Sequence, residues 1–301
     1  MSVHLIIGAS GQVGEHLVHQ ASVAGHTVVA TYHKHPVVGM QQLDIRDAKA
    51  TETLIAQVQP QVVYLPAALS HVDYCEQYPE ETYQINVMGV CNVLRAVNAV
   101  GAKLVYFSSD YVFDGKAGPY REEDPPNPIC EYGRQKVIAE HQIAINMYDY
   151  LIVRTTVVYG WERQGKNFVY RLLNTLKNSE ILKAPVDQVG NPTYAPDLAK
   201  AVVELIDLNK KGLYHIVGPQ RANRYEFACE VARVFALDGD LIQPIETFEL
   251  GQVAPRPLVA GMVVEKAESV LSLPLLRYQD GLRIMVEQNT AQGRIPEARQ
   301  E

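Results

Sequence analysis

The chain has 301 residues, a formal net charge of -7 at pH 7 and 47% hydrophobic residues, a composition typical of a globular protein. A negative charge without long basic runs argues against a nucleic-acid partner, because neutralisation of phosphates drives that kind of binding. Its four cysteines show no C-x-x-C spacing, so we expect neither a metal site nor a disulfide framework.

Apolar runs and amphipathic stretches alternate along the N-terminal half. The first run begins at Val3 with no signal segment before it, and no window approaches the roughly 18 apolar residues of a membrane helix, so we expect a cytoplasmic protein without a membrane partner. The runs predict buried strands over residues 3–7, 27–31, 62–65, 103–108 and 151–153. The amphipathic stretches predict helices over residues 12–24, 48–57, 82–100 and 132–146. This alternation indicates an α/β fold with a doubly wound parallel sheet of the Rossmann type.

The alternation weakens after about Tyr159, where prolines and glycines become frequent. Helices are predicted over 197–208 and 225–235 and a strand over 213–217. We therefore predict a Rossmann domain over residues 1–159 and a smaller C-terminal lobe over 160–301, with later segments interleaved with the sheet.

A glycine-rich loop joins the first predicted strand to the first predicted helix. Gly8 permits a tight turn, Gly11 lets the backbone approach a pyrophosphate, and Gly14 allows the helix to pack closely on the strand. An ordinary β-α turn is the alternative, but the position after the first strand favours a dinucleotide site. The predicted pyrophosphate-binding residues are Gly8, Ser10, Gly11, Gln12, Val13 and Gly14.

The end of the second predicted strand indicates which nicotinamide cofactor binds. NAD-selective folds place a carboxylate there for the ribose hydroxyls, whereas this chain has His33 and Lys34. We therefore predict that these two residues bind the 2'-phosphate of NADPH, with a solvated basic loop as the alternative. Asp44 and Ile45, after a third strand, are candidates for the adenine edge.

A second group of residues suits ketone reduction. Tyr132 and Lys136 lie four residues apart, on one face of a predicted helix, where the ammonium lowers the pKa of the phenol from about 10 and can hold the cofactor ribose. Ser109 stands at the carboxyl end of a predicted strand, the edge where open α/β sheets bind ligands. We predict that nicotinamide supplies hydride, Tyr132 supplies the proton and Ser109 orients the carbonyl. The alternatives are a capping role for Ser109 and a surface pair for the other two residues.

These motifs together resemble those of the extended short-chain dehydrogenase/reductases, most closely the dTDP-4-dehydrorhamnose reductase group. The likeness runs over nearly the whole chain and includes the segments G-A-S-G-Q-V-G, S-S-D-Y-V-F-D-G, Y-G-R-Q-K and D-Q-V-G-N-P-T. It implies that Ala67 and Ala68 lie beside the nicotinamide-side ribose, that Asn86 supports the active-site lysine, and that the C-terminal lobe binds a nucleotide sugar. It leaves a homodimer open as the assembly.

Departures from the family pattern fall mainly on the substrate side. Cys130, Val157 and Ala260 stand where the family commonly has asparagine, tryptophan and serine. We therefore expect looser sugar selectivity than is usual in the family. Asp110 is a candidate substrate residue, and Arg256 is a candidate for the substrate phosphate, with an ion pair to a surface carboxylate as the alternative.

Three functional hypotheses follow. The first is an NADPH-dependent reductase of a 4-keto-6-deoxy nucleotide sugar. The second is a reductase or epimerase of the same fold acting on another keto substrate. The third is a non-catalytic, NADP-binding regulatory subunit resembling the β subunit of methionine adenosyltransferase, which the presence of Ser109, Tyr132 and Lys136 disfavours.

Overall fold

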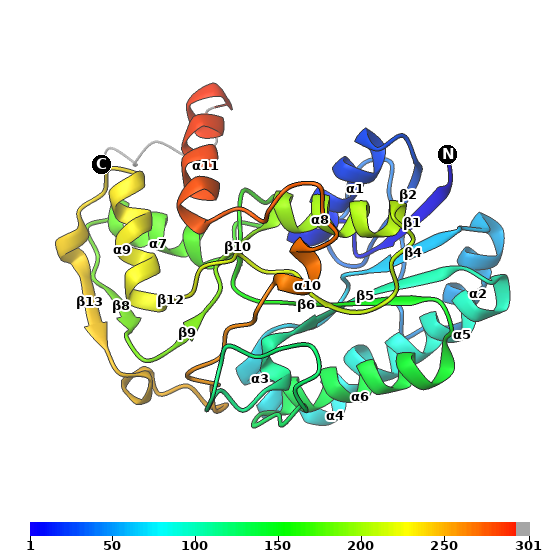
Figure 1. Cartoon of the computed structure of the whole chain (residues 1–301), viewed down its shortest axis with the longest axis horizontal. Helices are drawn as coiled ribbons and strands as arrows, with labels where there is room; N and C mark the ends of the chain where they lie inside the picture. The colour runs from blue at the N-terminus through cyan, green and yellow to red at the C-terminus, as the bar shows by residue number, and fades with distance from the viewer. Residues whose placement is uncertain (293–301) are drawn as a thin grey trace.

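A seven-stranded parallel sheet forms the centre of the larger lobe in the computed structural model, which describes residues 1–292 (Figure 1). The strand order is β11-β6-β5-β4-β1-β2-β3. The chain leaves β1 in one direction for β2 and later returns to β4 on the other side of β1, so the sheet is doubly wound, as predicted. The strands are β1 (Val3–Ile7), β2 (Thr27–Tyr32), β3 (Gln41–Gln42), β4 (Val62–Leu65), β5 (Lys103–Ser109), β6 (Tyr150–Thr155) and β11 (Gly212–His215).

Helices cover both faces of this sheet, which is why its central strands are continuous apolar runs. Every residue of β4 and β5 is buried. One face packs against α1 (Gln12–Val23) and α8 (Ala195–Asp207). The other packs against α2 (Ala48–Val58), α5 (Val90–Val100) and α6 (Glu131–Asn146).

The single helix predicted over 82–100 is divided in the structure. After α3 (Val72–Gln77), a short helix α4 (Pro79–Tyr83) passes through a π-helical turn, η1 (Gln84–Gly89), into α5. π-helical turns are frequent at functional sites because the extra residue redirects side chains. Here the turn carries Asn86, which is buried.

The smaller lobe has its own apolar core. Its main elements are α7 (Phe168–Lys177), β8 (Leu182–Pro185), α9 (Arg224–Val234), β13 (Ile242–Ile245) and α11 (Tyr278–Gln292). The remaining short strands form two pairs: β7 (Val158–Tyr159) with β10 (Thr193–Tyr194), and β9 (Val189–Gly190) with β12 (Ala222–Asn223). A short helix, α10 (Glu265–Glu268), follows β13 in the chain.

The second half of the chain serves both lobes. Helix α8 and strand β11 come from it and belong to the larger lobe, on α1 and beside β6. The sequence boundary after Tyr159 therefore does not divide the fold into two separate blocks. Residues 293–301 of the predicted C-terminal lobe lie outside the described residues.

Within residues 1–292, no helix combines the length and apolar character needed to cross a membrane. The same part of the chain contains no group of three or more His, Cys, Asp or Glu residues arranged to hold a metal ion.

Candidate active site

The glycine loop is packed too tightly to accept side chains at two of its positions. Gly8 has a φ of 94°, and a Cβ there would lie 2.8 Å from the Cβ of Ala67. A Cβ on Gly14 would collide with the Gly8 carbonyl oxygen. Gly11 precedes α1 without a side-chain cap, so backbone amides of the first helical turn are left for an anionic ligand. This geometry fits the pyrophosphate of a dinucleotide.

One cavity of about 640 Å³ connects the glycine loop with the predicted catalytic trio. Its walls include Gly8, Gly11, Gln12, Val13 and Gly14 at the loop and Ser109, Tyr132 and Lys136 at the sheet edge. Three buried polar atoms of lining residues have no hydrogen-bond partner within residues 1–292: Gln12 Nε2, Ser108 Oγ and Thr155 Oγ1. Buried polar groups are nearly always hydrogen-bonded, so these atoms suit a polar ligand in the cavity.

The three residues of the predicted catalytic trio are buried and lie close together. The Ser109 hydroxyl donates to Asp110 Oδ1 at 3.0 Å and accepts from the Tyr111 amide at 3.3 Å. Lys136 Nζ donates to the Phe107 carbonyl at 2.7 Å and lies 5.7 Å from the centroid of the Tyr132 ring. The ammonium thus lies beside the phenol, with a strand carbonyl holding it in place.

The expected effect of Lys136 on the tyrosine is not observed. Burial raises the pKa of Tyr132, and the nearby Cys75 and Asp110 raise it further, while a hydrogen bond with Ser109 lowers it. Burial also lowers the pKa of Lys136 to about 8. The prediction of a lowered phenol pKa was therefore wrong for the protein alone, and at neutral pH Tyr132 keeps the proton that a general acid must donate.

The depressed pKa of Lys136 predicts an alkaline limit to activity. As pH rises through about 8 the ammonium becomes neutral, so kcat/KM for NADPH should fall. A pH profile of NADPH oxidation measures this. Lys136→Arg, whose guanidinium does not titrate in this range, should be slower but lack the fall, and a profile of unchanged shape in that variant would contradict the assignment.

The region predicted for the adenosine phosphate contains a cation that sequence reasoning missed. Arg46 Nη2 donates to Asp44 Oδ2 at 2.6 Å, and His33 Nε2 lies 3.3 Å from the same carboxylate. These contacts, chiefly the hydrogen bond from Arg46, lower the pKa of Asp44 to about 2. Asp44 is thus occupied by Arg46, and Lys34 is an exposed cation near the end of β2. Ile45 is buried beneath this site.

Arg256 does not reach the cavity. Its guanidinium is bound to Asp73 on α3 at 2.9 Å and to the Ala254 carbonyl at 2.9 Å, and its side chain is only 7% exposed. Among the described lining residues the cations of the C-terminal lobe are Lys166 and Arg224 instead. In this structure Arg256 therefore forms an ion pair with a carboxylate, as the alternative to phosphate binding proposed.

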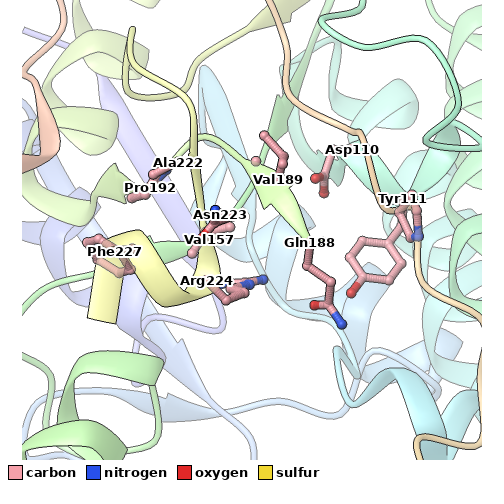
Figure 2. Close-up of a pocket in the computed structure, with 12 residues that line it drawn as sticks. Asp110, Tyr111, Val157, Gln188, Val189, Pro192, Ala222, Asn223, Arg224 and Phe227 are labelled. Atoms are coloured by element: carbon pink, nitrogen blue, oxygen red, sulfur yellow. The ribbon is translucent and has the colours of Figure 1, made fainter. Parts of the chain in front are cut away.

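A second pocket opens beside the catalytic cavity and shares Asp110, Tyr111, Val157 and Arg224 with it. Figure 2 shows Arg224 extending from the start of α9 toward Gln188, with Asp110 and Tyr111 on the far side. No sequence pattern singled out Arg224, because the pocket forms only when segments distant in the chain fold together.

The residues that depart from the family pattern lie around this region. Val157 lines both cavities and has a φ of 45°, a backbone conformation that is rare for a β-branched residue. Cys130 is buried in one apolar cluster with Tyr132. Ala260 is buried and its amide donates to the Val189 carbonyl at 3.1 Å.

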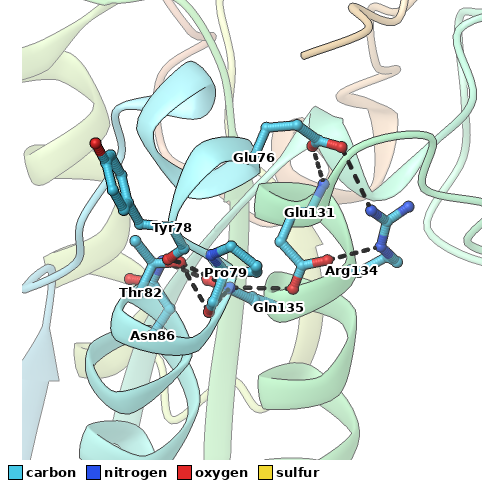
Figure 3. A network of polar contacts seen from close by, with 8 residues as sticks. All are labelled: Glu76, Tyr78, Pro79, Thr82, Asn86, Glu131, Arg134 and Gln135. Carbon is cyan, nitrogen blue, oxygen red and sulfur yellow. Dashed lines mark hydrogen bonds and ion pairs between the residues drawn. The ribbon is translucent and has the colours of Figure 1, made fainter. Parts of the chain in front are cut away.

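A polar network fastens the first turn of α6, which carries the tyrosine and the lysine, to the π-helical segment (Figure 3). Gln135 is fully buried. Its amide nitrogen lies 3.1 Å from the Pro79 carbonyl and 2.9 Å from Thr82 Oγ1, and its oxygen accepts from Asn86 Nδ2 at 2.9 Å. Asn86, expected to support Lys136, thus contacts the residue before it.

Taken together, the doubly wound sheet, the glycine loop and the Ser109, Tyr132 and Lys136 trio define a Rossmann-fold protein of the extended short-chain dehydrogenase/reductase class. Within that class, the chain belongs to the family described as RmlD substrate binding domain, whose model matches residues 1–291.

Relatives in this family have different names. The chain is 35% identical to the spore coat polysaccharide biosynthesis protein SpsK of Bacillus subtilis, over 85% of this chain and 87% of the relative. It is 31% identical to methionine adenosyltransferase 2 subunit beta of Xenopus tropicalis, over 88% and 81% of the two chains. The solved structure of dTDP-4-dehydrorhamnose reductase from Bacillus anthracis in complex with NADP is similar with a TM-score of 0.88 and 29% identity, covering 95% of this chain and 99% of that one.

Proposed function

We propose that the protein is an NADPH-dependent reductase of a nucleotide-linked 4-keto-6-deoxy sugar. The observation that carries the proposal is the single cavity that joins the glycine loop to Ser109, Tyr132 and Lys136. The likeness to an NADP-bound dTDP-4-dehydrorhamnose reductase supports the choice of cofactor and substrate class.

In this proposal the bound nicotinamide supplies a hydride to the carbonyl carbon. The Ser109 hydroxyl, which donates to Asp110 in the protein alone, turns its proton to the carbonyl oxygen of the substrate, and Tyr132 holds the proton that this oxygen takes up. Lys136 is held by the Phe107 carbonyl, where it binds the cofactor ribose and stabilises the phenolate left behind.

The test is a panel of keto substrates with NADPH oxidation as the readout. The purified protein should oxidise NADPH with dTDP-4-keto-6-deoxyhexose, and turnover with keto sugars that lack a nucleotide should be far slower. Turnover only with free ketones, or with no ketone at all, would contradict the proposal.

Cofactor preference provides a second test. NADPH should bind more tightly than NADH. Lys34→Ala should lower the ratio of the NADH to the NADPH dissociation constant several-fold, because it removes an exposed cation from the 2'-phosphate site. Lys49→Ala is the matched control, since Lys49 is also exposed but pairs with Glu52 on α2. Dissociation constants for both cofactors decide the matter, and equal ratios in the wild type and both variants would show that Lys34 is not the 2'-phosphate ligand.

A regulatory role is the second candidate, favoured by the 31% identity to methionine adenosyltransferase 2 subunit beta. It requires a catalytic partner enzyme, which the reductase does not need. Affinity purification from the source cells distinguishes the two, because a stoichiometric methionine adenosyltransferase and no ketone reduction would favour the regulatory role.

A further inference from the structure

Two arginines of the smaller lobe lie beside one aromatic ring in the wall of the cavity. The Cζ atom of Arg171, on α7, lies 5.4 Å from the centroid of Phe168, and that of Arg224, at the start of α9, lies 5.8 Å from the same centroid. Phe168 and Arg224 both line the cavity that contains the catalytic trio. The two guanidinium groups are therefore held beside the same ring of the cavity wall, Arg224 as a lining residue and Arg171 behind it.

Neither guanidinium has a carboxylate partner. Within residues 1–292, no ion pair within 4.0 Å involves Arg171 or Arg224, whereas arginines elsewhere, such as Arg46, Arg154 and Arg256, do form such pairs. Arg171 is an exposed residue, and desolvation of its guanidinium, followed by the like charge of Arg224, lowers its pKa. Two neighbouring cations without a counterion repel each other, and a bound anion would relieve that repulsion.

The acidic groups on the cavity walls do not supply that counterion. Among the described lining residues these are Asp110 and Glu162. Burial raises the pKa of Asp110 and outweighs the charge of Arg224, which lowers it, and no ion pair within 4.0 Å joins these two described residues. Glu162 Oε1 is occupied, because it accepts from the amides of Lys166 and Asn167 at 3.0 and 2.7 Å.

The position of the pair separates it from the cofactor phosphates. The dinucleotide pyrophosphate belongs to the glycine loop at the other end of the cavity, whereas Arg224 continues into the second pocket with Gln188 and Tyr111 (Figure 2). That pocket adjoins Asp110, whose carboxylate accepts from Ser109. A ligand whose carbonyl meets Ser109 therefore extends toward Arg224.

We infer that Arg224 and Arg171 form the anion site for the substrate, and that this site selects keto substrates carrying a phosphate or diphosphate group. The inference rests on the proposed reductase function and names the part of the chain that recognises its substrate class. Guanidinium groups suit this role, because each can donate two parallel hydrogen bonds to phosphate oxygens.

The test is calorimetric titration of thymidine 5'-diphosphate into protein saturated with NADP⁺, so that the cofactor phosphate sites are already filled. Arg224→Gln should weaken binding about 10- to 100-fold, and Arg171→Gln should weaken it less. Arg224→Lys should recover part of the loss because it keeps the charge. Arg233→Gln is the matched control, since Arg233 also lies on α9 but pairs with Glu230, and its affinity should be unchanged.

The affinity for NADP⁺ should remain within about twofold in each variant, which also verifies folding. If Arg224→Gln cannot be purified folded, Arg171→Gln and the salt dependence of wild-type binding decide the question, because binding to a cationic pair must weaken as ionic strength rises. Unchanged diphosphate affinity in the folded arginine variants, or wild-type affinity independent of salt, would overturn the inference.

Kinetics separate this inference from the proposed function. If the wild type reduces the dTDP-linked ketone and Arg224→Gln raises KM much more than it lowers kcat, both stand. An unchanged KM would overturn the anion site and leave the reductase intact. Arginine-dependent diphosphate binding without reduction of any nucleotide-linked ketone would support the anion site and contradict the reductase.

Discussion

Tyr132→Phe is expected to lower kcat by about 100-fold or more, the range typical for loss of a general acid. The ring should keep its place, because it is buried and packs edge-on against Tyr111 with centroids 5.7 Å apart. Only the hydroxyl, and with it the proton donor, is lost. Single-turnover oxidation of saturating NADPH with saturating keto substrate measures the effect, and the dissociation constant for NADPH should hardly change.

A second tyrosine provides the control. Tyr111 lines the same cavity and has its pKa raised to about 12, chiefly by burial, so it is the alternative proton donor. Tyr111→Phe should retain most of the chemical rate. A large loss in Tyr111→Phe with near-normal turnover in Tyr132→Phe would transfer the general-acid role to Tyr111. Lys136→Met should impair both turnover and cofactor binding.

The fold was largely predictable because its strands are buried on both faces. Runs such as 62–65 and 104–107 contain no charged or amide side chain, and the observed strands begin and end within two residues of the predicted bounds in the core of the sheet. The helix predicted over 82–100 was divided because its π-helical turn depends on tertiary contacts. Asn86 bonds there to Leu69 and Gln135, and neither contact follows from helical periodicity.

The proximity of Ser109, Tyr132 and Lys136 could be predicted because strand ends and helix faces position these residues, and both can be recognised in sequence. The substrate side depends on contacts between distant segments. Arg256 is occupied by Asp73, which lies on α3 in the other half of the chain, and Arg224 reaches the cavity only through the packing of the smaller lobe. The direction of the tyrosine pKa shift was missed because burial outweighs a nearby lysine, and the extent of burial is a property of the whole fold.

Of the substitutions proposed for this protein, removal of the buried Glu140 carboxylate should cause the largest loss of stability. Arg154, on β6, donates to Glu140, on α6, at 3.0 and 2.7 Å, and the two side chains are only 3% and 10% exposed. Glu140→Gln keeps the shape but leaves the arginine charge buried without a counterion, so the free energy of unfolding should fall by about 3–5 kcal/mol. Denaturant titration measures this.

Two further variants show whether the unpaired charge is the cause. Glu52→Gln removes a carboxylate from an exposed pair with Lys49 and should cost about 1 kcal/mol or less. The double variant Glu140→Leu with Arg154→Met removes both charges and should be more stable than Glu140→Gln, because an apolar pair leaves no buried charge unpaired. A double variant as unstable as Glu140→Gln would indicate lost packing instead.

The same substitution should be detectable in catalysis. The Glu140 carboxylate raises the pKa of Lys136, opposing the larger effect of burial that lowers it to about 8. Glu140→Gln removes the opposing charge, so the alkaline fall in kcat/KM should move to lower pH. Glu52→Gln should leave the profile unchanged. If the alkaline fall in kcat/KM stays at the same pH in folded Glu140→Gln protein, Lys136 is not the group that titrates. A shift to lower pH would show that the Glu140–Arg154 pair, which stabilises α6 on β6, also helps to keep Lys136 charged.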